Sequence, residues 1–192
     1  MLSSESPQPV NTIIADNKEW QIIEGEYIVP DGIRIIGEAA FFESQLKKIT
    51  LAQSVRKIEP KAFNHSQILY FNLPEKLEYI GSYAFSRTNA ATIHVPSSVK
   101  TIKSCAFDNC KNLEEIVIDI ESNKIPKEAF LYCSSLKSVK VIGKTKKICR
   151  RAFYGCVNLE SVVLSDNIRK ISKDAFDKCK KLRSVTIMSD RM

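Results

Sequence analysis

The sequence predicts a repeat solenoid, a β-rich, right-handed coil made of one unit repeated along the chain. Two observations support this. An Ala-Phe pair recurs seven times at intervals of 22 or 23 residues, and the other apolar positions keep the same spacing. Units of this size bury their apolar faces by stacking on their neighbours. The phenylalanines of the pairs are Phe41, Phe63, Phe85, Phe107, Phe130, Phe153 and Phe176.

Each unit is expected to contain one short strand soon after its Ala-Phe pair. An apolar residue is followed by a second three positions later and a third two positions after that, as in Leu113, Ile116 and Ile118. Apolar, mostly β-branched residues spaced two apart are typical of a strand with one buried face. Because the units repeat in register, these strands are predicted to lie parallel on a concave face, about 4.8 Å apart.

A second apolar pair, such as Leu77 and Ile80, follows each strand and predicts a second arm of the coil. In early units a proline such as Pro74 or Pro96 closes the strand, because it lacks a backbone donor and favours a turn. The Ala-Phe segment then bends the chain back. We predict a short helical turn there, with the small alanine in a crowded corner and the phenylalanine inside the coil.

These patterns divide the chain into residues 1–20, a partly flexible N-terminal extension, and residues 21–192, a solenoid of about seven units of 22–23 residues. Solenoids need a cap at each end. A cover for the N-terminal end is expected from Ile13, Ile14, Trp20, Ile22 and Ile23. No polar cap follows the last strand, so we expect this coil to pair end to end with a second copy, as a homodimer, or the chain to be a fragment.

Residues 68–85 read Ile-Leu-Tyr-Phe-Asn-Leu-Pro-Glu-Lys-Leu-Glu-Tyr-Ile-Gly-Ser-Tyr-Ala-Phe, and four later units keep Ala-Phe-x-x-Cys-x-x-Leu. This pattern closely resembles the BspA-like, or Treponema-type, leucine-rich repeats of bacterial and protist surface antigens, over about residues 27–188. The resemblance implies adhesion or protein recognition at a cell or host surface. Early units depart from it, because Ser44, Ser66 and Thr88 replace the cysteine.

The N-terminus lacks the basic start and apolar stretch of a secretory signal, and no apolar run approaches the ~18 residues that span a bilayer. As written, the chain is expected to stay in the cytoplasm, where it is made, or to reach the cell surface if a leader is missing.

Four cysteines recur at an interval of 23 residues and are expected to form a buried ladder of free thiols. Cys105 and Cys149 fall outside this ladder and could be exposed. Neither has the close Cys-x-x-Cys spacing of a zinc site, and the sequence has only two histidines. The ladder residues are Cys110, Cys133, Cys156 and Cys179.

No motif for catalysis is found. The sequence contains neither a Gly-rich phosphate loop nor a Gly-x-Ser-x-Gly elbow, and no carboxylate pair recurs from unit to unit. His94 takes an outward strand position, whereas the ladder cysteines face inward, so no Cys-His pair is expected. The sequence therefore predicts neither an enzyme nor a cofactor or metal site.

The outward strand residues are expected to form rows across the sheet. Outward apolar residues such as Val117 and Val163, beside Tyr70 and His94, suit a protein-contact face. They would equally suit a solvated sheet of ordinary β-formers. The candidate partner-binding residues are Tyr70, Asn72, Thr92, His94, Glu115, Val117, Lys140 and Val163.

Charge is uneven, with a net of −1 over residues 1–100 and +8 over residues 101–192. Stacked like charges repel, so the basic side chains either splay into water or hold an anionic glycan or membrane surface. Nucleic acid ranks behind these, because only Tyr132 and Tyr154 offer rings nearby. The candidate anion-binding patch is Lys124, Lys146, Lys147, Arg150, Arg151, Arg169 and Lys170.

The function that fits these features is non-catalytic recognition of a protein partner, in the manner of an adhesin or surface antigen. Two alternatives stay open: an intracellular scaffold protein, and a binder of an anionic ligand through the basic C-terminal half.

Overall fold

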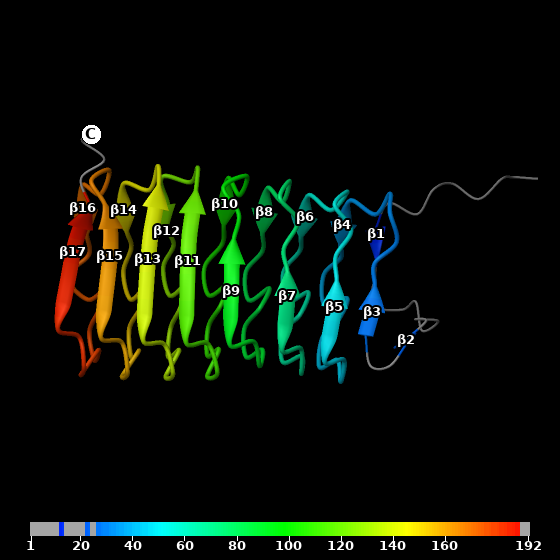
Figure 1. Cartoon of the computed structure of the whole chain (residues 1–192), viewed down its shortest axis with the longest axis horizontal. Coiled ribbons are helices and arrows are strands. Elements are labelled where there is room, and N and C mark those ends of the chain that lie inside the picture. Colours follow the sequence, from blue (N-terminus) through cyan, green and yellow to red (C-terminus); the bar gives the residue numbers. More distant parts are fainter. Residues whose placement is uncertain (1–11, 14–21, 24–25, 189–192) are drawn as a thin grey trace, which may run out of the picture.

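A computed structural model describes residues 12–13, 22–23 and 26–188. The chain winds into a stack of coils, and each full coil contributes one longer and one shorter strand (Figure 1). The longer strands are β3 (Glu26–Ile28), β5 (Lys48–Thr50), β7 (Tyr70–Asn72), β9 (Thr92–Val95), β11 (Glu115–Ile120), β13 (Ser138–Gly143), β15 (Ser161–Ser165) and β17 (Ser184–Met188). The shorter strands are β1 (Thr12–Ile13), β4 (Ile35–Ile36), β6 (Lys57–Ile58), β8 (Tyr79–Ile80), β10 (Thr101–Ile102), β12 (Lys124–Ile125), β14 (Lys147–Ile148) and β16 (Lys170–Ile171).

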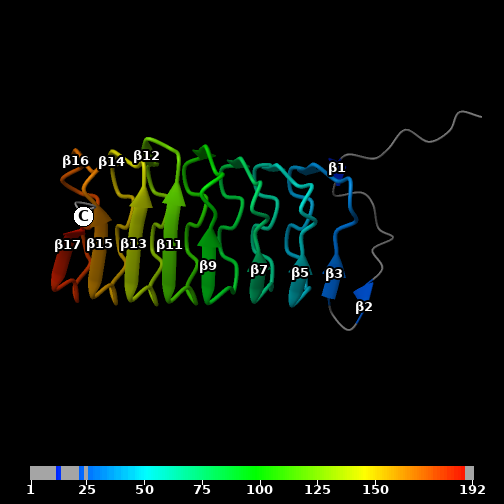
Figure 2. The same ribbon diagram turned by 45° about the horizontal axis from the view of Figure 1, so that its top comes forward.

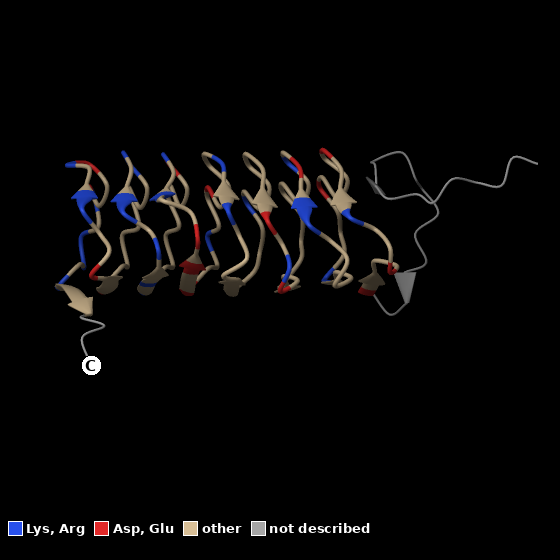
Figure 3. Ribbon diagram, turned by 90° about the horizontal axis from the view of Figure 1, so that it is seen from above, with Lys and Arg blue, Asp and Glu red and all other residues tan. Residues whose placement is uncertain are grey.

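The predicted solenoid with parallel strands is confirmed. Equivalent residues of successive units pair with one another, as Ile116 pairs with Val139 and Val139 with Val162. The longer strands line one side of the stack and the shorter strands the other (Figure 3). The stack is nearly straight (Figures 1 and 2), and we name its two sides the long-strand face and the short-strand face.

The long-strand face consists of two sheets, β2-β3-β5-β7 and β9-β11-β13-β15-β17. All neighbours are parallel except β2 (Ile22–Ile23), which lies antiparallel to β3. The hydrogen-bond ladder is interrupted between β7 and β9. The interruption coincides with two departures from the repeat, because Phe71 stands where later units have Ile or Val, and Ala90 stands where they have Leu.

The short-strand face is also divided, into β1-β4-β6-β8-β10 and β12-β14-β16. This break has a chemical cause. The residue after a short strand elsewhere donates its backbone N–H to the preceding coil, as Lys103 does to the Ile80 carbonyl over 2.9 Å. Pro126 occupies this position after β12 and has no N–H, so it cannot bond to Ile102. The proline thereby removes one bond between the two halves of the face, and the Lys124 N–H, whose equivalents bond to the preceding coil, donates to Ser122 Oγ instead.

The phenylalanines of the Ala-Phe pairs form one continuous column through the core. Neighbouring rings from Phe41 to Phe176 have centroids 5.0 to 5.3 Å apart and planes within 15° of parallel. Near-parallel rings at such distances are offset stacks, each worth about 0.5–1.5 kcal/mol beyond burial. The column therefore joins each coil to the next independently of the sheets on the two faces.

The predicted helical turn at the Ala-Phe segment is wrong, and the described residues contain no helix. The residues two before and two after the phenylalanine have positive φ in most coils, as Cys105 and Asn109 do around Phe107. A left-handed residue ends a right-handed helix. The N–H of Phe107 instead donates to the Ala129 carbonyl of the next coil over 2.8 Å. The corners thus form a third ladder of bonds along the stack.

The N-terminal end is described only in part, because Ile14 and Trp20 of the expected cover lie outside the described residues. Ile13 in β1 pairs with Ile36, and Ile22 in β2 pairs with Tyr27. The backbone of both segments therefore extends the edge of a sheet. The boundary between residues 1–20 and the solenoid stays a prediction. Within the described ranges, no helix is long and apolar enough to cross a membrane.

Candidate binding surfaces

The eight candidate partner-binding residues lie on the long-strand face in two rows, as their spacing predicted. Lys140 pairs with Val117 on one side and Val163 on the other, while Val139 and Val141 beside it point into the core. Tyr70 is 65% exposed, and Val117 and Val163 are half-buried. The remaining exposed residues of the set are Asn72, Thr92, His94, Glu115 and Lys140.

Ile28 was not predicted to belong to this face, yet it is 60% exposed there. It pairs with Thr50, which itself pairs with Asn72, so Ile28 begins the second row. Beside it, Glu26 accepts hydrogen bonds from Lys48 and Thr50, which lower the pKa of its carboxyl. The repeat spacing of 22 residues was the signal that could have found Ile28.

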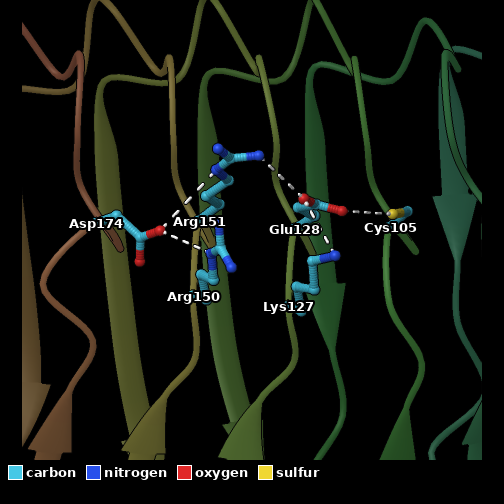
Figure 4. A network of polar contacts seen from close by, with 6 residues as sticks. All are labelled: Cys105, Lys127, Glu128, Arg150, Arg151 and Asp174. Atoms are coloured by element: carbon cyan, nitrogen blue, oxygen red, sulfur yellow. Dashed lines mark hydrogen bonds and ion pairs between the residues drawn. The ribbon is translucent and has the colours of Figure 1, made fainter.

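Arg150 and Arg151 of the candidate anion-binding patch belong to a network of ion pairs at the corners of the coils (Figure 4). Asp174 Oδ2 lies 3.1 Å from Arg150 Nε and 3.9 Å from Arg151 Nε. Glu128 Oε1 lies 3.8 Å from Arg151 Nη1 and 3.6 Å from Lys127 Nζ. Both arginines are therefore balanced by carboxylates and are less suited to hold an external anion.

Cys105 lies at the end of this network and is only 5% exposed, so the expectation that it could be exposed is wrong. It occupies a left-handed corner position between Tyr83 and Glu128 of the adjacent coils. Its hydrogen bond with Tyr83 is the main cause that raises the pKa of that phenol to about 12. Burial raises the pKa of the Cys105 thiol. Cys149, the other cysteine outside the ladder, is half-buried.

The predicted cysteine ladder is confirmed. The thiols of Cys110, Cys133 and Cys156 are buried and Cys179 is half-buried, and all six cysteines are free thiols. Each ladder thiol donates to the carbonyl of a phenylalanine in the preceding coil, at 3.0 to 3.2 Å. Burial raises the pKa of Cys133 well above its usual range, which keeps that thiol protonated and able to donate.

Three other residues of the patch, Lys124, Lys147 and Lys170, form a row on the short-strand face. Lys124 pairs with Lys147 and Lys147 with Lys170, on the neighbouring strands β12, β14 and β16 (Figure 3). Over the described ranges, no carboxylate lies within 4.0 Å of their ammonium groups. We call these three residues the lysine row.

The last two residues of the patch flank this row. Lys146 is exposed, whereas Arg169 Nη1 donates to the backbone carbonyls of Asp166 and Ile168. The structure thus separates the predicted patch into the lysine row with Lys146, one arginine bonded to its own loop, and two arginines paired with carboxylates.

An open hollow lies beside the lysine row, at the break between β10 and β12. Its lining includes Lys100, Lys103 and Lys124, together with Ser104, Ser122 and Asn123, and contains no Asp or Glu. Lys103 was not among the predicted residues of the anion-binding patch. Pro126 lines the same hollow and interrupts the ladder of hydrogen bonds. A proline at this position of the repeat was the sequence signal for an irregular coil here.

The last described coil leaves apolar side chains open to solvent. Ile187 in β17 is 62% exposed, and Ile171 and Val185 are exposed as well. β17 is the outer strand of its sheet. End-to-end pairing through this coil stays a prediction. Within the described residues, no three His, Cys, Asp or Glu side chains are placed to hold a metal ion.

Parallel strands in register, a column of phenylalanines and a ladder of cysteines define a leucine-rich repeat solenoid. The family model described as BspA type leucine-rich repeat region (6 copies) matches residues 24–137 and 106–191. The chain therefore belongs to this family, as its repeat pattern indicated.

One solved structure, with a TM-score above 0.5, shows the same fold, and two others are similar in part. The leucine-rich repeat protein TpLRR of T. pallidum is 26% identical with a TM-score of 0.74, over 83% of this chain and 78% of that one. A leucine-rich cell surface protein of Faecalibacterium prausnitzii is 22% identical with a TM-score of 0.43, over 86% of this chain and 60% of that one. The pneumococcal vaccine antigen PcpA is 23% identical with a TM-score of 0.48, over 84% of this chain and 50% of that one.

The chain therefore spans 60% and 50% of the lengths of the latter two proteins. No curated protein matches it.

Proposed function

We propose that this chain is a non-catalytic module that recognises another protein through the long-strand face. The observation that carries the proposal is the pair of outward rows on this face, in which Tyr70 and Ile28 expose most of their side chains. Tyrosine is enriched at protein interfaces, because its ring offers a large apolar contact and its hydroxyl a hydrogen bond. Around them stand hydroxyl, amide and charged groups that suit the polar part of an interface.

The rigidity of this face supports the same function. Its side chains project from strands held by sheet hydrogen bonds on either side of the interruption between β7 and β9. The ring of Phe71 in β7 packs edge-on against the stacked rings of Phe63 and Phe85. Binding to a preorganised surface costs less conformational entropy than binding that must order a loop. A row of residues at fixed spacing can therefore hold several contacts with a partner at once.

The partner is proposed to lie at a cell or host surface, as the resemblance to surface-antigen repeats implied. An intracellular scaffold would use the same face in the same way. The compartment in which the captured partner occurs distinguishes the two.

The test is capture of a partner from extracts of the cells and of the surface that they contact. The double variant Tyr70→Ala/His94→Ala is expected to lose at least about tenfold in affinity for the captured protein, because aromatic anchors dominate interface energies. Tyr132→Ala is the matched control, since Tyr132 is an exposed tyrosine that packs on Tyr154 at the corners of the coils. A partner bound equally well by both variants would overturn the assignment of the face.

A further inference from the structure

The lysine row lacks the coil-to-coil ion pairs that several other lysines of the solenoid make. Lys137 pairs with Glu114, 23 residues earlier, at 2.8 Å, and Lys144 pairs with Glu121 at 2.7 Å. The same arrangement holds Lys48 to Glu26 and Lys100 to Glu78. Beside Lys147 and Lys170, the preceding coil presents another lysine instead. Three like charges on neighbouring strands, which lie about 4.8 Å apart, repel one another, so the row costs stability when nothing binds it.

The hollow at the Pro126 break continues this basic surface toward the N-terminus. Lys103 and Lys124 line it, and no described carboxylate lies within 4.0 Å of either ammonium group. Ser104, Ser122 and Asn123 add hydroxyl and amide groups to its lining. The surface therefore offers a line of cations across neighbouring strands, followed by a hollow with cations and neutral hydrogen-bonding groups.

The neighbouring side chains restrict the kind of anion that this surface fits. Nucleic acid bases stack on free aromatic rings, but Lys57 and Lys103 place their ammonium groups 4.9 and 5.9 Å from the centre of the nearby Tyr79 ring. Stable binding to a membrane surface combines basic residues with an apolar face that enters the bilayer. Of the isoleucines in β12, β14 and β16, Ile125 and Ile148 are buried and Ile171 alone is exposed. A polyanion with a saturated, hydroxyl-bearing backbone requires neither rings nor apolar side chains.

We propose that the lysine row and the hollow beside it bind an extended sulfated polysaccharide that runs across strands β12, β14 and β16. The sulfates lie against Lys124, Lys147 and Lys170. The sugar hydroxyls meet Ser104, Ser122 and Asn123 in the hollow. This site lies on the short-strand face and is independent of the protein-binding function proposed for the long-strand face.

Heparin binding to the full chain tests this site. The variant Lys124→Gln/Lys147→Gln/Lys170→Gln is expected to bind heparin about tenfold more weakly or worse, with a smaller dependence on salt, because exposed ion pairs are screened. The matched control is Lys48→Gln/Lys137→Gln/Lys144→Gln, which removes the same charge from lysines already paired with glutamates. Its heparin affinity is expected to stay within about twofold of the unaltered chain.

Equal weakening in both triple variants would show an effect of net charge alone and would overturn the site. Tighter binding to single-stranded DNA or phosphatidylserine vesicles than to heparin would overturn the ligand class, and an unaltered chain that does not bind heparin at low salt would overturn both. Circular dichroism of both variants checks their fold.

Thr101→Glu, a single change beside the hollow, is expected to weaken heparin binding independently. Tyr70→Ala is expected to leave it unchanged, which separates this proposal from that for the protein-binding face.

Discussion

The thiol of Cys133 donates a hydrogen bond to the carbonyl oxygen of Phe107, 3.1 Å away in the preceding coil. The same bond recurs in the coils that follow and ties each corner to the backbone beneath it. In an earlier coil, Ser66 stands in the cysteine position. Its hydroxyl is buried and has no hydrogen-bond partner among the described residues. The C–O bond of serine is shorter than the C–S bond of cysteine. The Ser66 hydroxyl therefore does not reach the phenylalanine carbonyl of the preceding coil.

Ser66→Cys is therefore expected to stabilise the protein by about 1 kcal/mol, because it replaces an unsatisfied buried hydroxyl with a bonded thiol. Urea unfolding measures the change. Ser44→Cys is the control, since Ser44 Oγ already accepts a hydrogen bond from the Leu46 N–H over 3.2 Å. If both substitutions gave the same gain, the missing partner of Ser66 would not be the cause.

Phe107→Ala is expected to destabilise the protein by about 3–5 kcal/mol, because it empties a fully buried place in the phenylalanine column. Phe107 stacks on both Phe85 and Phe130. Phe176→Ala should cost clearly less, because Phe176 is only partly buried and the ring that stacks on it is that of Phe153. Chemical denaturation of both variants tests this difference. An equal loss would contradict the idea that the column acts through rings stacked on both sides.

Asp108 is expected to make stability depend on pH. Burial raises the pKa of its carboxyl above its ordinary value of 3.8, although Asn109 and Ser86 donate hydrogen bonds to it. A raised folded-state pKa means that the folded protein holds the proton more tightly, so this group lowers stability as pH rises through its folded pKa. Asp108→Asn is therefore expected to be more stable than the unaltered chain at neutral pH, with a smaller advantage below pH 3.8.

Urea unfolding at the two pH values measures this advantage. Asp177→Asn, a change at an exposed carboxylate near the same corners, is expected to show none. An Asp108→Asn variant that gained equally at both pH values would rule out the carboxylate charge as the cause.

The last described coil is expected to make the 192-residue chain associate with itself as its concentration rises, because Ile187, Val185 and Ile171 are exposed there. Ile187→Lys should reduce this association, since a charge on an edge strand opposes strand pairing. Light scattering over a concentration series measures it. A chain that stays monomeric at high concentration would argue against end-to-end pairing.

The rows and columns of the solenoid could be predicted because they depend on repeat spacing alone. Once the Ala-Phe pairs fix the register, the neighbours of Phe107, Cys133 and Lys147 follow from counting 22 or 23 residues. The same spacing could also have predicted ion pairs that were not foreseen, because Lys137 lies 23 residues after Glu114 and pairs with it.

The corners could not be predicted in the same way. Left-handed backbone is usually signalled by glycine, but here Tyr83 and Cys105 take that conformation. The ladder of bonds to the next coil holds them there, and it exists only after the coils have stacked. The pairing of Arg150 and Arg151 with Asp174 likewise depends on side-chain directions at these corners. Spacing alone places Lys124 and Arg150 in one patch, although only the first is free of a carboxylate.

The bond from the Phe107 N–H to the Ala129 carbonyl recurs between the same two positions of successive coils, always toward the C-terminal neighbour. Removing one whole unit from the middle of the stack would therefore bring together a donor and an acceptor of the same kind, whereas removing a few residues would not. The length of the stack can therefore change only by whole coils. Each step is about 4.8 Å, the spacing of strands in a sheet, and leaves the kind of backbone bond at the corners unchanged.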